Sequence, residues 1–276
     1  MINFSAQERY LELLKHVLID LHRVSSVDYV PFSKKHSGIL SLLFKPFLFF
    51  INLFNYDFVR VKKYSIEERV AGEDWPLHAE SMIGLKRMNN LQYCISEIHK
   101  NNIEGDLIET GVWRGGASIF MKANLIALKD EKRKIYVCDS FRGLPKPDPK
   151  VHQDRGDKLH SFDYLAVSKS NVIDNFKKYN VLDHNILFVE GWFKDTLPTL
   201  RGNKFSLLRL DGDMYESTMD ALTNLYDGLT GGGFIIIDDW TLTGCRQAVL
   251  DFRKERGIAD PMQEIDASSV YWCKSK

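Results

Sequence analysis

The chain contains few cysteines and no excess of charge of either sign. Its four cysteines are scattered, without a CxxC pair beside matching histidines, which excludes a zinc knuckle and argues against a disulfide framework. Lysine plus arginine and aspartate plus glutamate both number 37, so no basic field is available for the phosphates of nucleic acid. We therefore expect a cytoplasmic protein that does not bind nucleic acid.

An uninterrupted apolar run of membrane-spanning length is also missing. The opening residues, MINFSAQERYLELLKHVLID, place apolar residues at helical spacing among charges, which predicts an amphipathic helix rather than a signal peptide. Residues 38–55 are strongly apolar, but Lys45 and Pro46 in their centre disfavour a spanning helix. Three interpretations of this segment stay open: a buried helical hairpin, a surface that packs on a partner subunit, and a peripheral contact with the membrane surface.

From about Leu91 onward, short apolar runs alternate with segments of helical periodicity. The runs are DLIET, KIYVCDSF, NILFVEG, FSLLRLDGD and GGFIIIDDW, and the tail MQEIDASSVYWCKS predicts two further strands in a closing hairpin. This pattern predicts an α/β fold with a doubly wound, mostly parallel, seven-stranded sheet. The glycines of residues 230–234 are expected to form only a turn into the fifth run. Ligands of such sheets bind outside the carboxyl ends of the strands.

The first of these runs ends in a glycine-rich turn, IETGVWRGGAS. Gly111, Gly115 and Gly116 permit a tight turn and a close backbone approach by a nucleotide-like ligand. The spacing departs from the dinucleotide GxGxxG motif, and Glu109 beside the turn would repel a pyrophosphate. Asp139, at the end of the second run, can accept hydrogen bonds from ribose hydroxyls. A nucleoside with a cationic group and without phosphates fits these residues, which favours S-adenosylmethionine.

Four aspartates follow two later runs. Asp211 and Asp213 come after FSLLRL, and Asp238 and Asp239 come after GGGFIII. Only one helical crossover separates the two runs, so we expect neighbouring strands and converging carboxylates. Hard oxygen ligands of this kind select Mg²⁺ or Ca²⁺ over softer metals. For Asp213, a helix cap or a solvated loop acid is an open alternative.

Seven collinear segments resemble one known family. They are DWPLHAESMIGLKRMNNLQ, DLIETGVWRGGASIFM, CDSFRGLPKPD, GWFKDTLP, LRLDGDMYESTMDAL, IIIDDW and CRQAVLDFRKERGI. Together they resemble the macrocin O-methyltransferase (TylF) family of bacterial sugar methyltransferases over residues 74–272. The resemblance implies a class I, Rossmann-like methyltransferase fold, S-adenosylmethionine as methyl donor, a bound Mg²⁺, transfer to a sugar hydroxyl, and a homodimer.

The resemblance also assigns roles to particular residues. It implies that Asp211, Asp238 and Asp239 bind the metal and that Asp211 is the general base, with His78 and His160 as alternative bases. The residues expected to contact the donor are Ser81, Met82, Glu109, Gly111, Gly115, Asp139, Ser140, Phe141, Gly191 and Trp192. Core packing is an alternative role for Trp192, and a plain helix start is an alternative for Ser81 and Met82.

The sequence divides into two expected regions. Residues 1–73 would form a helical N-terminal extension and lid region, and residues 74–276 the methyltransferase domain. The long connection over residues 142–168, together with residues 64–78, is expected to cover the acceptor. The predicted function is Mg²⁺-dependent O-methylation of a sugar hydroxyl on a glycosylated natural product or surface glycan. A catechol-like phenol acceptor and a non-catalytic scaffold are the alternatives.

Overall fold

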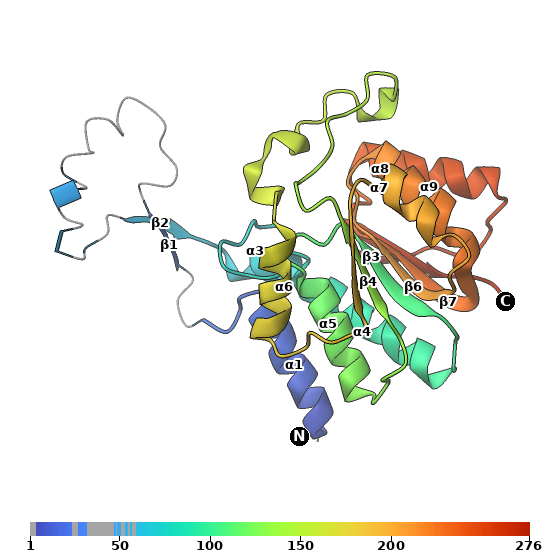
Figure 1. Ribbon diagram of the computed structural model, residues 1–276, viewed down its shortest axis with the longest axis horizontal. Helices are drawn as coiled ribbons and strands as arrows, with labels where there is room; N and C mark the ends of the chain where they lie inside the picture. The colour runs from blue at the N-terminus through green and yellow to red at the C-terminus, as the bar shows by residue number, and fades with distance from the viewer. Residues whose placement is uncertain are drawn as a thin grey trace.

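A seven-stranded sheet forms the centre of the computed structural model, which describes residues 4–23, 27–31, 47, 49–50, 53–54, 56 and 59–276 (Figure 1). The strand order is β5-β4-β3-β6-β7-β9-β8. The strands are β3 (Asp106–Thr110), β4 (Ile135–Asp139), β5 (Ile186–Glu190), β6 (Phe205–Leu210), β7 (Leu229–Ile237), β8 (Gln263–Asp266) and β9 (Ser269–Cys273). Strands β3 to β7 pair in parallel, and β9 is antiparallel to both β7 and β8. The predicted mostly parallel sheet with a closing hairpin is confirmed.

Helices cover both faces of this sheet because its strands present apolar side chains alternately to either side. On one face, α1 (Ala6–Leu18), α4 (Gly84–Lys100), α5 (Gly116–Ala127) and α6 (Lys169–Lys178) share a core with Leu107 of β3. On the other face, α8 (Tyr215–Leu225) and α9 (Thr243–Glu255) share a second core with the next residue, Ile108. The short α7 (Phe193–Thr196) follows β5 on the same side as α8. The fold is therefore a three-layer α/β/α arrangement.

The strand order creates a crevice beside β3. The chain runs outward from β3 through β4 to β5 and then returns to place β6 on the opposite side of β3. Ligands of open α/β sheets bind at such a switch point, beyond the carboxyl ends of the strands. Thr110 pairs with Leu210, and Leu210 pairs with Ile237. The next residues along the chain, Gly111, Asp211 and Asp238, are consequently brought together at one edge.

The glycine-rich residues 230–234 belong to β7 itself rather than to a turn before it. The β6–β7 pairing shifts register between Phe205 and Leu207. A Cβ on Gly233 would lie 2.7 Å from the Ser206 carbonyl oxygen. The glycines thus let the irregular start of β7 approach β6 closely, and the expectation of a simple turn was wrong.

The N-terminal helix α1 packs into the main core. Ser5 and Glu8 form a reciprocal capping box at its start, and Leu11, Leu14 and Leu18 belong to the core cluster that contains α5. Beyond α1, β1 (Val27–Pro31) and β2 (Val59–Lys63) form a separate antiparallel pair that extends away from the sheet (Figure 1). The short helix α3 (Ile66–Ala71) then leads back to the body.

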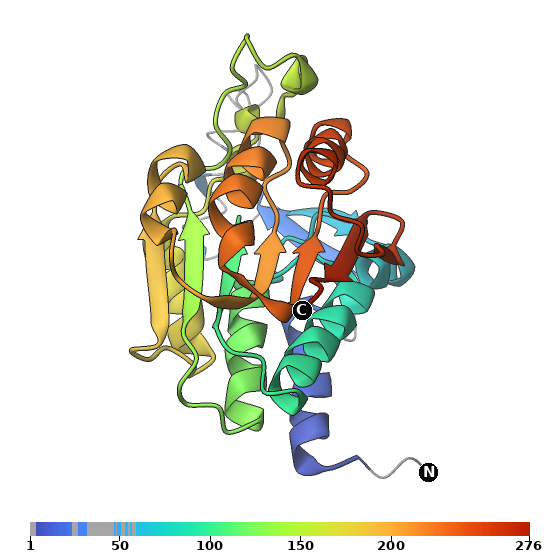
Figure 2. The same cartoon turned by 90° about the vertical axis from the view of Figure 1, so that its right-hand side faces the viewer.

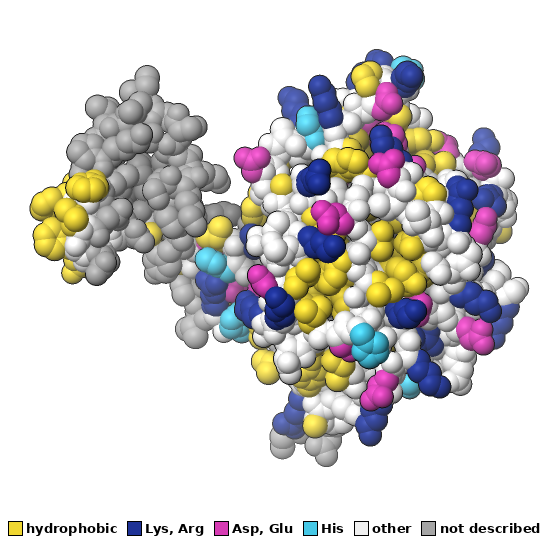
Figure 3. Space-filling model, viewed as in Figure 1, with side chains coloured by type: hydrophobic (Ala, Val, Ile, Leu, Met, Phe, Trp, Pro, Cys, Tyr) yellow, Lys and Arg dark blue, Asp and Glu magenta, His cyan; other side chains and the backbone are white. Residues whose placement is uncertain are grey.

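Most of residues 38–55 lie outside the part of the chain that the structure describes. Five members of the segment that are described have exposed side chains, and they appear as the apolar patch at the far left of Figure 3: Phe47, Phe49, Phe50, Leu53 and Phe54. The exposure of these five side chains argues against the interpretation of the segment as a buried helical hairpin. Within the described residues, no helix combines the length and apolar character needed to cross a membrane.

Candidate active site

A cavity of about 750 Å³ opens at the carboxyl ends of the parallel strands. Figure 2 shows the connection over residues 142–168, here called the lid, rising beyond these strand ends. The sequence-predicted residues that line the cavity are Ser81, Met82, Glu109, Gly111, Asp139, Ser140, Gly191, Trp192, Asp211, Asp238 and Asp239. His78 and His160, the alternative bases, do not line it. The structure thus gathers residues from five strand ends into one space.

Two of the expected donor residues lie elsewhere. A Cβ on Gly115 would meet Val172 Cγ1 at 2.8 Å, so this glycine serves the packing of α6 against the turn. Its neighbour Gly116 lines the cavity instead. Phe141 is buried in the core, and it contributes only its backbone N–H, which donates to Asp139 Oδ1 at 2.7 Å. Glycine spacing and sequence proximity did not distinguish these packing roles from contact with a ligand.

Gly111 is required by the crossing of two strand ends. Its φ of 84° lies in the left-handed region, and a Cβ there would overlap the carbonyl oxygen of Asp211. The Asp211 N–H donates to the Thr110 carbonyl at 2.9 Å, which holds the two chain segments together. The donor turn and the acidic turn are therefore in direct backbone contact.

The donor side of the cavity combines two buried carboxylates. Asp139 accepts hydrogen bonds from the Val112 N–H at 2.8 Å and the Phe141 N–H, and burial raises its pKa. Glu109 accepts from Arg209 Nη1 at 2.6 Å and from the Ser118 hydroxyl. Burial, opposed by Arg209, raises the pKa of Glu109 to about 7. A carboxylate in such a place favours a cationic ligand group, and Asp139 retains acceptor capacity for hydroxyls.

Residues 74–83, here called the donor segment, pass over this side of the cavity. The backbone N–H groups of Glu80 and Ser81 both donate to the Leu18 carbonyl at 3.0 Å, and the Gly116 N–H donates to the Glu80 carbonyl at 3.0 Å. The Glu80 carboxylate accepts from Lys178 Nζ at 2.5 Å. Ser81 and Met82 are thereby fixed on the cavity wall by contacts to α1, α5 and α6 at once.

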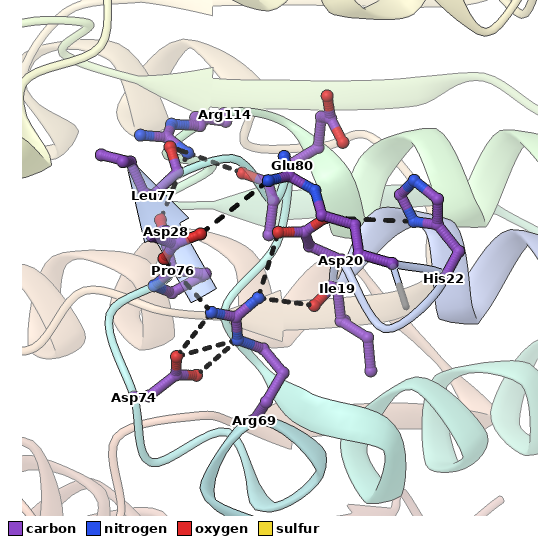
Figure 4. A network of polar contacts seen from close by, with 12 residues as sticks. Ile19, Asp20, His22, Asp28, Arg69, Asp74, Pro76, Leu77, Glu80 and Arg114 are labelled. Carbon is purple, nitrogen blue, oxygen red and sulfur yellow. Dashed lines mark hydrogen bonds and ion pairs between the residues drawn. The ribbon is translucent and has the colours of Figure 1, made fainter. Parts of the chain in front are cut away.

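A buried arginine fastens the start of the donor segment (Figure 4). Arg69 is 1% exposed, and its Nε donates to both oxygens of Asp74 at 2.8 and 2.9 Å. Its Nη1 reaches Asp20 Oδ2 at 3.3 Å, and its Nη2 lies 3.9 Å from Asp28 Oδ2. The guanidinium thus joins the end of α1, strand β1 and the donor segment.

A second arginine holds the middle of the donor segment. Arg114, in the glycine-rich turn, donates through Nη1 to the carbonyls of Leu77 and Ala79 at 3.0 and 2.8 Å (Figure 4). The Tyr164 hydroxyl of the lid donates to the Pro76 carbonyl at 2.5 Å. The Tyr164 ring also stacks on Trp75, with centroids 5.2 Å apart. The lid, the glycine-rich turn and the donor segment therefore contact one another here.

An acidic cluster lies next to the donor side of the cavity, and Arg209 Nη1 bridges its Asp211 to Glu109. One carboxylate oxygen from each of Asp211, Asp213 and Asp239 lies within 4.8 Å of the other two. Asp213 has a left-handed φ of 59°, and its backbone N–H donates to Asp239 Oδ2 at 2.9 Å. Asp213 is not the side-chain cap of the following helix, because α8 has no side-chain cap at its N-cap residue Met214. The open alternative of a capping role is thus excluded.

Asp238 lies beside this cluster but is paired differently. Its Oδ1 accepts from Arg209 Nη2 at 2.6 Å, and its Oδ2 accepts from Arg87 Nη1 at 2.9 Å. Burial opposes ionisation, but the two arginines outweigh it and hold the pKa of Asp238 below its usual range. The same Arg209 also donates to Asp211 Oδ2 at 2.8 Å. Of the three expected metal ligands, the geometry therefore groups only two, and Asp213 takes the third place in the cluster.

The charges around the acidic cluster do not balance. Six carboxylates, from Glu109, Asp211, Asp213, Asp238, Asp239 and Asp266, face two guanidinium groups, from Arg87 and Arg209. Burial raises the pKa of Asp211 to about 6 and raises the pKa of Asp213 and of Asp239 well above the ordinary value, with the neighbouring aspartates adding to the effect. An oxygen-rich, electron-rich site of this kind fits a hard divalent cation.

Two arginines that pair with the carboxylates of this site were not predicted from the sequence. Arg209 carried a signal, because a charged residue inside the apolar run FSLLRL must find a partner if the strand is buried. Arg87 carried none, since a single arginine on an amphipathic helix is ordinarily exposed. Its contact with Asp238 joins residues 151 positions apart, which periodicity does not reveal.

Comparison with known proteins identifies the family of the chain. The sequence profile of the macrocin-O-methyltransferase (TylF) family matches residues 7–274. A relative from Streptomyces olivaceus, 8-demethyl-8-(2,3-dimethoxy-alpha-L-rhamnosyl)-tetracenomycin-C 4'-O-methyltransferase, is 49% identical over 208 residues, covering 75% of this chain and 80% of the relative. Mycinamicin III 3''-O-methyltransferase from Micromonospora griseorubida is 45% identical over 213 residues, covering 76% and 84%.

A solved structure resembles almost the whole chain. The O-methyltransferase NovP superposes with a TM-score of 0.83 at 37% identity, covering 98% of this chain and 100% of NovP. This likeness extends the agreement in sequence to the three-layer fold and to the class I methyltransferase architecture. The chain therefore belongs to the macrocin-O-methyltransferase (TylF) family and is an S-adenosylmethionine-dependent O-methyltransferase.

Proposed function

We propose that the protein methylates a sugar hydroxyl of a glycosylated natural product. The observation that carries the proposal is the single cavity that is lined both by buried Glu109 and Asp139 and by the acidic cluster. The relatives support it, since the name of the Streptomyces relative describes O-methylation of a rhamnosyl-bearing tetracenomycin and that of the Micromonospora relative describes 3''-O-methylation of mycinamicin III. A surface glycan would present the same sugar hydroxyl. A panel of acceptors distinguishes a glycosylated natural product from a surface glycan.

The donor half of the cavity suits S-adenosylmethionine. We propose that Asp139 accepts hydrogen bonds from the ribose hydroxyls and that Glu109 lies near the cationic methionine end. Ser81, Met82 and Gly111 would enclose that end, with Ser140 beside the ribose and Gly191 and Trp192 beside the adenine. The sulfonium methyl is already activated, so the task of these residues is alignment with the acceptor oxygen.

We also propose that the acidic cluster holds Mg²⁺. Asp211 and Asp239 belong both to the set implied by the family resemblance and to the set that the geometry groups. For the third ligand, the geometry favours Asp213, because both oxygens of Asp238 are occupied by arginines. A bound Mg²⁺ would acidify an acceptor hydroxyl and stabilise developing negative charge on its oxygen.

The general base is proposed to be an aspartate of this cluster. Asp211, the expected base, lines the cavity, but the Arg209 guanidinium beside it favours the ionised form and weakens it as a base. Asp213 is a second candidate, because no arginine of the described chain hydrogen bonds to its carboxylate and burial raises its pKa well above the ordinary value. Either carboxylate would accept the hydroxyl proton as the acceptor oxygen takes the methyl group.

Paired substitutions distinguish the two bases. Asp211→Asn and Asp213→Asn should both fold, and the variant that lacks the base should lose about 10² to 10⁴ in kcat. The pH profile of the other variant should keep the acidic limb, in which activity falls as the general base is protonated. Comparable activity of both variants and the wild type would place the base outside the cluster.

Calorimetric titration tests the donor, and turnover tests the acceptor. S-adenosylmethionine and its demethylated product should both bind in the presence of Mg²⁺. Mycinamicin III and a catechol then serve as probes of the sugar and phenol alternatives, with product formation read by mass spectrometry. Methylation of the catechol alone would overturn the sugar assignment, and absence of donor binding would favour the scaffold alternative.

Two further proposals concern the oligomeric state of the enzyme and its contact with a membrane. We propose a cytoplasmic homodimer, as the family resemblance and the cysteine content led us to expect. We also propose that it touches the membrane surface through residues 38–55, on the basis of the exposed aromatic side chains described there and the exposed cations Arg60 and Lys63. Co-sedimentation with anionic vesicles tests the contact, with neutral vesicles as control. Light scattering of the purified protein tests the dimer. No sedimentation with either vesicle, or the mass of a monomer, would contradict the respective proposal.

A further inference from the structure

The lid is anchored by a buried aspartate that belongs to no predicted site. Asp154 lies in a short 3-10 turn, His152–Asp154, and is 3% exposed. Its Oδ1 accepts from the backbone N–H of Tyr215 at 2.6 Å, and its Oδ2 accepts from the backbone N–H of Glu216 at 3.0 Å. These bonds join residues 61 and 62 positions apart. Both oxygens of the carboxylate are thereby used on the first turn of α8.

Helix α8 lacks an N-terminal cap of its own. Its N-cap residue is Met214, whose side chain makes no capping hydrogen bond. The first N–H groups of a helix have no partner within the helix, and they form the positive end of its dipole. An aspartate is among the best caps for such groups, with a contribution of about 1 kcal/mol in typical cases. The lid supplies this cap from outside the helix.

A glycine of α9 leaves the space that the Asp154 carboxylate occupies. A Cβ on Gly244 would lie 2.7 Å from Asp154 Oδ1 and 3.0 Å from the Tyr215 nitrogen. Gly244 is the second residue of α9 and has no φ in the left-handed region, so its backbone would tolerate another residue. The glycine is therefore explained by space for the carboxylate rather than by backbone conformation.

The anchored helix begins at the acidic cluster. Asp211 and Asp213 precede α8 directly, and Glu216 and Asp220 of α8 line the cavity. The lid lines the same cavity on both sides of Asp154, through residues 144–149 and through Leu159 and Leu165. A fixed distance between the lid and the start of α8 therefore fixes the shape of the cavity around Glu216 and Asp220.

We propose that Asp154 is a positioning residue that fastens the lid to α8 and so closes the acceptor end of the cavity. The docking itself depends only on the hydrogen bonds described above. Its effect on an acceptor rests on the proposed function. The lid contacts the donor segment through Tyr164 rather than through Asp154, and Arg69 and Arg114 hold that segment as well, so donor binding should not depend on Asp154.

Hydrogen exchange on the full chain tests the docking without any acceptor. Asp154→Ala should raise amide exchange at Tyr215 and Glu216 and across the lid about fivefold to thirtyfold, as expected for loss of a cap. Gly244→Ala should do the same without removing a charge. Asp163→Ala, an exposed aspartate of the same lid, is the matched control and should leave exchange unchanged. Wild-type exchange rates in both Asp154→Ala and Gly244→Ala would overturn the proposal.

Kinetics test the consequence. With mycinamicin III as the acceptor probe, Asp154→Ala should raise the acceptor KM about tenfold while the calorimetric affinity for S-adenosylmethionine stays at the wild-type value. Asp154→Asn keeps one acceptor oxygen, so its acceptor KM should lie between that of the wild type and that of Asp154→Ala. An equal loss for donor and acceptor would mean a general structural role and would contradict positioning. Failure of the wild type to methylate the probe would count against the proposed function alone, because exchange still decides the docking.

Discussion

At the scale of single residues, four neighbouring aspartates occupy two different environments. Asp238 has an arginine on each oxygen, whereas Asp211, Asp213 and Asp239 bring their oxygens together. Strand endings predicted that carboxylates would converge, and they do. The sequence did not indicate which aspartate faces an arginine, because that depends on Arg87 of α4, far away along the chain.

The different environments predict different effects of amide substitution. Asp213→Asn should weaken Mg²⁺ binding at least tenfold with little loss of stability, since it removes one charge from a repelling group. Asp238→Asn should lower the melting temperature, because it leaves Arg87 and Arg209 incompletely paired. Titration calorimetry and thermal denaturation measure the two effects. The opposite assignment, with Mg²⁺ binding lost only in Asp238→Asn, would restore the ligand set that the family resemblance implies.

Cation binding should also depend on pH. Burial raises the pKa of Asp211 to about 6 when no cation is bound, so below that pH the carboxyl carries a proton that Mg²⁺ must displace. Affinity should therefore fall as the pH drops through about 6, and protonation of Asp213 and Asp239, whose pKa values burial also raises, adds to the fall. Calorimetry between pH 5 and pH 8 checks this. A flat profile would show that these aspartates are not the ligands.

At the scale of elements, the glycine-rich turn and the acidic turn constrain each other. The sequence predicted both turns from strand endings and glycine content. Their contact follows from the pairing of β3 with β6, which a single sequence does not specify. The same limit applies to Gly115, because its packing neighbour Val172 lies on α6.

Two glycines with similar backbone angles provide a matched test of this contact. Gly111 and Gly156 have φ values of 84° and 89°, but only Gly111 has a neighbour in the place of a Cβ. Gly156→Ala should cost about 1 to 2 kcal/mol from the left-handed backbone alone. Gly111→Ala should cost more and should abolish donor binding. Equal free energies of unfolding in urea would show that the close approach to Asp211 has no consequence.

The arginine that fastens the donor segment makes a further prediction. Arg69→Met should destabilise the fold by about 3 to 5 kcal/mol, because Asp74 would lose its cation and the buried Asp20 and Asp28 would keep only Arg23. In the fraction that folds, the affinity for S-adenosylmethionine should fall with the loosened donor segment. Arg256→Met, which removes an exposed pair with Asp227, is the control. Similar behaviour of the two variants would refute the role of Arg69.

At the scale of the whole molecule, periodicity and strand endings were sufficient to predict the layered α/β fold. They did not show how α1 joins it. The helix was expected as part of an extension, yet Leu11, Leu14 and Leu18 are in the same core as α5, and the Leu18 carbonyl holds the donor segment. Amphipathic spacing predicts that a helix has an apolar face but not which surface that face covers.

The central claim is that one cavity joins S-adenosylmethionine to a sugar hydroxyl beside a cation held by aspartates. The most direct measurement is methyl transfer from labelled S-adenosylmethionine to mycinamicin III, with Mg²⁺, with EDTA, and with the Asp211→Asn variant. Singly methylated product should form with Mg²⁺ and should fall at least a hundredfold in the other two conditions. Full activity in EDTA and in the variant would contradict the claim.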